Sequence, residues 1–275
     1  MIHRMANKKT IKHYVGYLPV YGCIATGIIY LGIGVIAILS FLKLKDGGAD
    51  ETSLLAFLND YVIGKIFIWL ILLGTLSYIT WRIFEAFKDP YGYGSDAKGR
   101  LKRIGIALST IADALIAYSA IRILVGTGDT NKNGQPEEYR EMVTNILQHS
   151  GGNWLIVITG VIIFATAIIQ FIYGITRGYK ERLDIAHFSS ATKKLIHLLA
   201  WVGYFSRGVI LGITGFFFMK AGILSDGQYI VNTDKAFDFI GDNLGGFFFI
   251  LVAAGTICYA LFMFSLGVTY DADKD

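Results

Sequence analysis

The chain has 275 residues, of which 54% are hydrophobic, and its mean hydropathy is +0.52. This composition is too apolar for an ordinary soluble domain of that length. The formal net charge is +4, but no stripe of Lys and Arg alternates with aromatic residues. We therefore expect contact with anionic lipid and exclude nucleic acid as a partner.

Six apolar runs follow one another along the chain, each close to the roughly 20 residues that cross a ~30 Å hydrocarbon core. They cover residues 18–42, 62–84, 101–125, 154–176, 198–222 and 246–268. The runs are apolar on all sides, which predicts membrane-spanning helices rather than the amphipathic helices of a soluble domain. A barrel would need short alternating segments, which these runs lack.

The charged loops predict the orientation. Most of the Lys and Arg residues lie in the N-terminal segment, in the loops 82–103 and 177–194 and in the C-terminal tail. Acidic residues predominate in the loops 43–61, 126–153 and 223–245. The positive-inside rule then predicts that both termini are cytoplasmic and that the three acidic loops lie outside.

The chain repeats one pattern three times, with a period of roughly 90 residues. The copies cover residues 9–92, 98–184 and 192–271. Gly74-Thr-Leu-Ser-Tyr78 in the first copy recurs as Gly255-Thr-Ile-Cys-Tyr259 in the third, and the second has Gly160-Val-Ile-Ile-Phe164. A two-helix unit returns to its starting side, so the copies are parallel. We expect one all-α membrane domain over residues 1–275, with six transmembrane helices and pseudo-threefold symmetry.

Each outer loop contains a short amphipathic segment just before the second apolar run of its copy. These segments are 52–61, 137–147 and 233–241. Such segments favour the membrane interface, with the apolar side toward the acyl chains. Two roles remain open for them: a structural cap over the bundle, or a docking surface for a periplasmic protein partner.

Three polar residues occupy one equivalent position in the first helices of the copies. The aligned segments are 24–29, 111–116 and 205–210, and the residues are Thr26, Asp113 and Arg207. Both charged residues lie far from the ends of their apolar runs, near the bilayer midplane. An ionised side chain there costs at least ~2.5–3.5 kcal/mol, so each should face the bundle interior and find a partner.

We expect Asp113 and Arg207 to approach each other, with Thr26 alongside. One interpretation is a buried salt bridge that fixes the register of the copies. The other is a substrate or proton site, because intramembrane carboxylates often mark such pathways. A third possibility is that the two side chains do not touch, and the pattern alone leaves all three open.

A calcium-loop opening lies in the middle outer loop, where Asp129, Asn131 and Asn133 alternate before Gly134. Oxygen ligands on alternate residues and a glycine at the sharp turn are typical of such loops. Position twelve is Arg140, where a bidentate glutamate is required. A solvated Asn/Gly turn explains the pattern better than a bound calcium ion. No other cofactor is expected, because the five histidines show no metal-ligand spacing.

The repeated hairpin, the Tyr204-Phe-Ser-Arg207 stretch and the Gly-Thr-x-x-Tyr motif resemble the bacterial membrane family called Domain of Unknown Function 1206. The resemblance covers nearly the whole chain. It implies three tandem two-helix units and a bacterial inner membrane. The first two copies have Thr26 and Asp113 where the third has Arg207, so an arginine role does not extend to them. The family is uncharacterised, and the resemblance implies no activity or site.

No nucleophile–base set is present, so we do not expect an enzyme. Our first interpretation is a non-catalytic accessory or scaffold subunit of a membrane protein complex. The alternative is a small solute or ion transporter that uses Thr26, Asp113 and Arg207. Fold analogy cannot decide between them.

Overall fold

The computed structural model describes residues 17–44, 48–89, 94–128, 133–183, 185 and 187–269. Within these residues the long elements are α2 (Leu18–Phe41), α4 (Val62–Lys88), α5 (Ala97–Val125), α7 (Gly152–Thr176), α8 (Ser190–Leu224) and α10 (Gly246–Val268). The short elements are α3 (Glu51–Asn59), α6 (Glu137–Leu147), α9 (Thr233–Leu244) and the 3-10 turns η1 (Gly178–Arg182) and η2 (Gly227–Tyr229). Each expected apolar run is therefore a helix.

Five of the long helices are apolar and long enough to cross a membrane, counted over the described residues. They are α2, α4, α7, α8 and α10. The helix α5, which corresponds to the expected third span, has 29 residues but is not among the five. The chain is thus a helical membrane protein with at least these five candidate spans.

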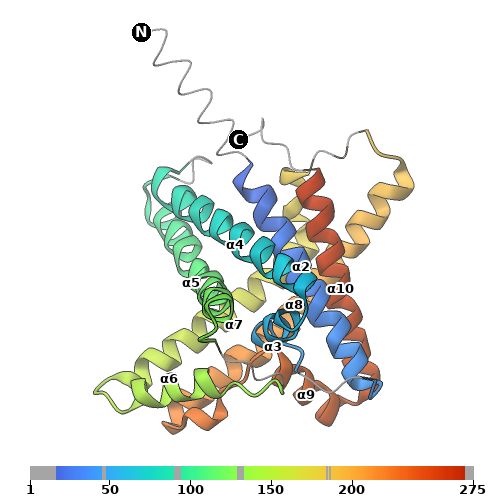
Figure 1. Ribbon diagram of the computed structural model, residues 1–275. Coiled ribbons are helices and arrows are strands. Elements are labelled where there is room, and N and C mark those ends of the chain that lie inside the picture. The colour runs from blue at the N-terminus through green and yellow to red at the C-terminus, as the bar shows by residue number, and fades with distance from the viewer. Residues whose placement is uncertain are drawn as a thin grey trace.

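The short helices α3, α6 and α9 gather at one end of the molecule, at the bottom of Figure 1. Asp50 accepts hydrogen bonds from the Thr52 and Ser53 N–H groups, and Asn232 accepts one from the Lys235 N–H. These N-caps satisfy amide groups that have no partner within the helix. The sequence predicted all three helices, and their boundaries differ from expectation by no more than three residues.

The apolar sides of the short helices face the bundle, and this corrects the expectation that they face the acyl chains. Leu54 and Leu55 of α3, and Phe237 and Ile240 of α9, are buried in the main hydrophobic core with residues of α2, α4, α5 and α10. Val143 of α6 is buried against α7, α8 and the turn after η2. These side chains gain the same removal from water by packing against the long helices as they would gain at the acyl chains. The three helices thus pack onto this end of the bundle.

The first and third repeats are built alike. A Cβ atom on Gly74 would lie 2.6 Å from both the Ala25 Cβ and the Tyr21 carbonyl oxygen of α2. A Cβ atom on Gly255 would clash with Ser206 of α8, which stands at the same sequence offset from Gly255 as Ala25 does from Gly74. In both repeats the repeated glycine therefore lets the second helix approach the first closely.

The second repeat is built differently. Its glycine, Gly160, packs against Met219 and Gly215 of α8, which belongs to the third repeat. The helix α7 packs along α8, while α5 packs on α4 and α3, and among the described residues α5 and α7 do not pack along each other. Gly208 and Gly212 of α8 face Phe171 and Ala167 of α7. The symmetry of the repeats is therefore clear for the first and third only.

Candidate functional site

Arg207 of α8 lies inside the bundle between two tyrosine rings from other helices. Its guanidinium carbon is 4.9 Å from the ring centre of Tyr30 on α2 and 4.9 Å from that of Tyr259 on α10. Arg207 Nη1 also donates a hydrogen bond to the Tyr259 hydroxyl. A cation over an aromatic face is stabilised by about 2 kcal/mol where water is excluded. The rings thus replace part of the hydration that the arginine loses.

No carboxylate forms a direct ion pair with Arg207 among the described residues. The charge of Arg207 interacts through space with Asp113 of α5 and with Glu51 at the start of α3. Arg207 Nε is buried and has no hydrogen-bond partner within the described part of the chain. One cation therefore lies near two carboxylates in an arrangement that leaves a donor unused. In a salt bridge that fixes the register of the copies, the guanidinium N–H groups would instead donate directly to carboxylate oxygens.

Thr26 lies on α2, one helical turn before Tyr30. Among the described residues it forms no hydrogen bond with Arg207, and Tyr30 provides the contact from α2. The three residues aligned in the sequence thus belong to helices around one interior region. The direct partners of Arg207 are the tyrosines.

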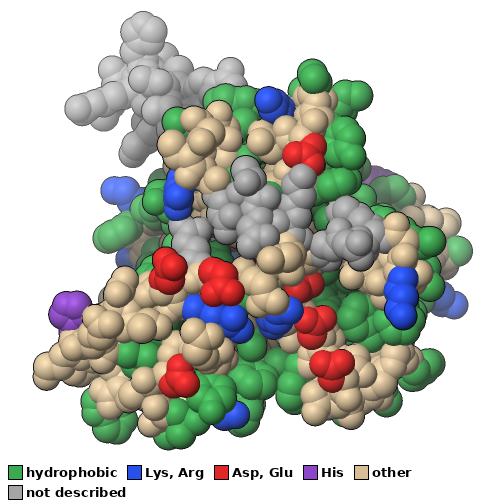
Figure 2. All heavy atoms as spheres, turned by 60° about the horizontal axis from the view of Figure 1, so that its bottom comes forward, with side chains coloured by type: hydrophobic (Ala, Val, Ile, Leu, Met, Phe, Trp, Pro, Cys, Tyr) green, Lys and Arg blue, Asp and Glu red, His purple; other side chains and the backbone are tan. Residues whose placement is uncertain are grey.

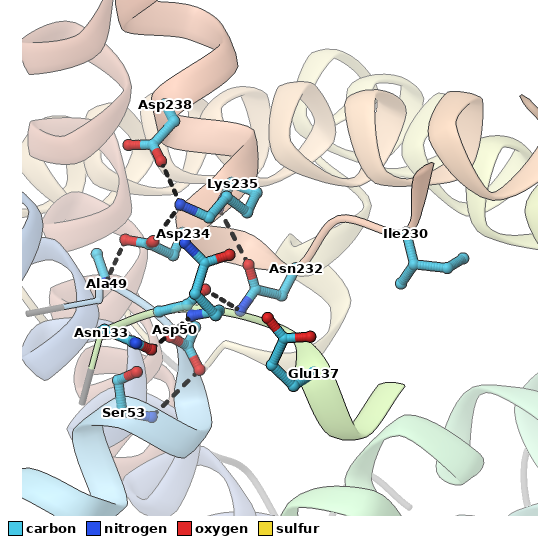
Figure 3. A network of polar contacts seen from close by, with 12 residues as sticks. Ala49, Asp50, Ser53, Asn133, Glu137, Ile230, Asn232, Asp234, Lys235 and Asp238 are labelled. Atoms are coloured by element: carbon cyan, nitrogen blue, oxygen red, sulfur yellow. Dashed lines mark hydrogen bonds and ion pairs between the residues drawn. The ribbon is translucent and has the colours of Figure 1, made fainter. Parts of the chain in front are cut away.

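A second polar cluster joins the three outer loops, and we call it the outer junction (Figure 3). The Ala49 N–H donates a 2.6 Å hydrogen bond to Asp234 Oδ1 of α9. Asn232 Nδ2 donates a 3.1 Å hydrogen bond to the Gly134 carbonyl oxygen. Because Ala49, Gly134 and Asn232 belong to the first, second and third repeats, the junction ties all three together.

Close backbone contacts complete the outer junction. A Cβ atom on Gly134 would lie 2.1 Å from Asp234 Oδ2, and one on Gly48 would lie 2.1 Å from the Gly134 Cα. Gly134 also has a φ of +72°, a conformation that glycine adopts without steric cost. Neither position accepts a side chain without a shift of the neighbouring loop.

Burial, together with the nearby negative charges of Asp238 and Asp50, raises the pKa of Asp234 to about 6. The hydrogen bond from Ala49 and the charge of Lys235 oppose this shift. The Lys235 ammonium lies 2.7 Å from Asp238 and 3.7 Å from Asp234. Asp234 is thus a carboxyl that changes charge close to physiological pH.

Two more carboxylates extend from the outer junction toward Arg207. Asp50 is 3% exposed, and its Oδ2 atom is buried without a hydrogen-bond partner in the described residues. Burial raises the pKa of Asp50. Burial also raises the pKa of Glu51, as does the adjacent Asp50 charge. Both Glu51 carboxylate oxygens are 3.3 Å from the Thr233 hydroxyl of α9.

The calcium-loop residues are only partly described. Asp129 and Asn131 lie outside the described residues. Asn133 Oδ1 accepts a 3.2 Å hydrogen bond from the Gln135 N–H, which is the geometry of an Asx turn. Within the described residues, no three His, Cys, Asp or Glu side chains converge as metal ligands.

The sequence reasoning missed most of the partners of Arg207. The repeated Gly-Thr-x-x-Tyr motif singles out Tyr259, its last residue. Nothing in that motif indicates that the tyrosine contacts Arg207. Glu51 and Asp234 gave no signal, because they lie in outer loops that the sequence separates by more than 180 residues. Only the folding of α3 into the bundle brings Glu51 near Arg207.

The fold and the repeated glycine contacts define a helical membrane protein built from three two-helix repeats. The family model described as Domain of Unknown Function (DUF1206) matches the chain three times, at residues 21–89, 104–177 and 202–270. The chain belongs to this family. It is also similar to the uncharacterized protein YxxB of Bacillus subtilis (strain 168), with 24% identity over 95% of this chain and 93% of that protein. No solved structure matches it.

Proposed function

We propose that the protein is a multi-pass transporter of the bacterial cytoplasmic membrane that moves a small solute or ion past Arg207. The observation that carries this proposal is the open charge arrangement around Arg207, with two carboxylates nearby and one buried donor unpaired. A purely structural arginine in a membrane interior would be costly to keep in this state. Charged groups with unused hydrogen-bonding capacity are instead typical of a site that an ion or polar solute visits.

The proposal includes a topology with six spans, in which α5 crosses the membrane and both termini are cytoplasmic. A helix of 29 residues is about 43 Å long, which exceeds the hydrocarbon thickness. The distribution of Lys and Arg supports the orientation. In this arrangement α3, α6 and α9 lie on the outer side, and the three repeats are related by an approximate threefold axis along the membrane normal. We propose no catalytic role and no resident cofactor.

Ion-evoked currents test this proposal. Purified protein in proteoliposomes, adsorbed to a solid-supported membrane, would be exposed to jumps of NaCl, KCl, ammonium chloride, sodium acetate and pH. We expect at least one jump to give a current that protein-free liposomes lack and that Arg207→Gln abolishes. Arg100→Gln is the matched control, because Arg100 is an exposed arginine whose Nε donates to the Ser95 carbonyl oxygen. If no jump gives a protein-dependent current, the transport proposal is wrong.

A scaffold or accessory role remains the second candidate, and the outer cap favours it. Figure 2 shows acidic and basic side chains interspersed over the outer face, with apolar side chains around them. Such a mixed surface is typical of a protein-binding face. Purification in mild detergent at native expression, followed by determination of mass and subunit composition, tests this role. A stoichiometric membrane or periplasmic partner would support it, and a lone protomer would contradict it.

A further inference from the structure

Buried carboxylates form a chain from the outer face toward Arg207. Asp234 and Asp50 lie in the outer junction, where each influences the charge of the other. Asp50 and Glu51 are consecutive residues at the start of α3, but their environments differ. Asp50 bonds the N–H groups of its own helix, whereas Glu51 reaches Thr233 and the charge of Arg207.

The environment of these three carboxylates favours their protonated forms. Asp50 Oδ2 is a buried acceptor that no described donor satisfies, so a proton on that atom would remove an uncompensated charge. The other charged groups nearby are Lys235 and Asp238 on α9, and Arg207 on α8. The ring of Tyr30 on α2 lies against Arg207, and Asp113 of α5 interacts through its charge with Arg207 and Arg82. Lys235 bonds Asp238 and its charge also acts on Asp50, whereas Arg207 is the cation whose charge acts on Glu51.

We infer that Glu51 is a proton-binding site, loaded from the outer face through Asp234 and Asp50. The inference rests on the proposed function in naming the proton as the coupling ion. A proton from the outer solvent forms an O–H bond on the Glu51 carboxylate, which becomes neutral and loses its attraction for Arg207. Arg207 keeps its positive charge, which Asp113 then offsets without Glu51. When the proton leaves, the O–H bond breaks and the original charges return.

The consequence for the site is a change of charge balance. With Glu51 ionised, Arg207 is offset by two carboxylates; with Glu51 protonated, it is offset by one. Binding of a proton therefore makes the site more positive by one charge and better suited to an anionic solute. The raised pKa of Glu51, caused by burial, brings this change closer to neutral pH.

Proton binding can be measured without any transport assay. Infrared difference spectra of the protein in lipid nanodiscs, recorded during a pH titration, report the carbonyl stretch of protonated carboxyl groups. We expect one titrating band in the wild type that is absent in Glu51→Gln. Asp242→Asn is the matched control, because Asp242 is an exposed carboxylate on α9. A full set of bands in Glu51→Gln would overturn the inference.

A second variant guards against misfolding of Glu51→Gln. Thr233→Val removes the hydroxyl that donates to Glu51 while it keeps the shape of the side chain. Because this hydrogen bond favours the ionised form, its loss should move the midpoint of the Glu51 band to higher pH. An unchanged midpoint would count against the assignment.

The two proposals fail separately. If the Glu51 band titrates but no ion jump gives a current, proton binding stands and transport is wrong. If a current of another ion is unchanged in Glu51→Gln, and that variant also retains every carboxyl band, transport stands and proton binding at Glu51 is wrong.

Discussion

Asp234 links the stability of the outer junction to pH. Burial raises its pKa to about 6, so the protonated form is favoured in the folded protein. For a carboxyl with a raised pKa, the stabilisation is complete at acid pH and is lost as the pH rises through about 6. We expect the wild-type protein in detergent to lose stability between about pH 4 and pH 6.5, by at most ~3 kcal/mol from this residue, and to show little further change from it above that range.

Asp234→Asn isolates that contribution. The amide oxygen can still accept the hydrogen bond from Ala49, but the side chain stays neutral at every pH. Thermal unfolding should therefore show a flatter pH dependence than the wild type, and higher stability at pH 7.5. Asp242→Asn should leave the profile unchanged. A wild-type protein that becomes more stable as the pH rises over this range would contradict the prediction.

Arg207 should be costly to remove alone and less costly to remove together with Glu51. Arg207→Met removes the hydrogen bond to the Tyr259 hydroxyl and the positive charge that acts on two carboxylates, which we expect to destabilise the protein by ~1–3 kcal/mol. Adding Glu51→Gln removes one of these charges and should restore part of the loss. The double-mutant cycle, measured by thermal unfolding in detergent, gives the coupling directly. Strictly additive losses would show that the two charges do not interact.

For individual residues, the sequence predicted that Asp113 and Arg207 lie in the interior, but not which side chains contact them. Alignment of the copies placed Asp113 and Arg207 in the same interior region, because a membrane forces ionised side chains inward. The same alignment suggested a direct pair. Among the described residues α5 packs on α4 and α3 rather than along α7 of its own repeat. Asp113 forms no ion pair with Arg207 in this part of the chain, and Tyr30 and Tyr259 make the contacts. No periodicity in the sequence records that change of packing.

At the level of helices, the close approach of α8 and α10 depends on Gly255. A Cβ atom there would lie 1.7 Å from Ser206 Oγ, so Gly255→Ala should push the helices apart and destabilise the protein by ~1–3 kcal/mol. Gly212→Ala is the matched control, since its new Cβ would meet only Ala167 at an ordinary 3.8 Å. Thermal unfolding of both variants compares them.

Ser206→Ala should recover part of the loss caused by Gly255→Ala, because it removes the nearest atom. Equal stability of the two glycine variants would show that this contact is looser than the structure indicates. The Ser206→Ala single variant provides the reference for the double variant.

The short outer helices show what could be predicted for an element and what could not. Their amphipathic pattern and polar caps identified α3, α6 and α9 almost to the residue. The pattern could not say whether the apolar side would meet lipid or protein, because both are equally apolar. Buried Phe237 and Leu55 give the answer, since they fill the interior between the long helices.

For the whole molecule, composition predicted the helical membrane fold, and the repeat predicted how its first and third parts are built. The repeat did not predict that α7, the second helix of the second repeat, would pack along α8 of the third repeat. The cause is visible in particular residues: Gly160, Gly215 and Gly222 allow α7 and α8 to approach backbone to backbone. Small residues drive helix association in membranes regardless of which repeat they belong to.

The number of spans depends on α5, and its two ends provide the test. Ser95 precedes α5 and Thr127 follows it, and both are exposed. In a background with Cys23→Ala and Cys258→Ala, a membrane-impermeant maleimide should label Thr127→Cys in intact spheroplasts. Ser95→Cys should be labelled only after the membrane is permeabilised, because the basic residues at the start of α5 hold that end inside. Labelling of both cysteines from the same side would mean that α5 does not cross. The chain would then have five spans and termini on opposite sides, and Asp113 would lose its place in the membrane interior beside Arg207.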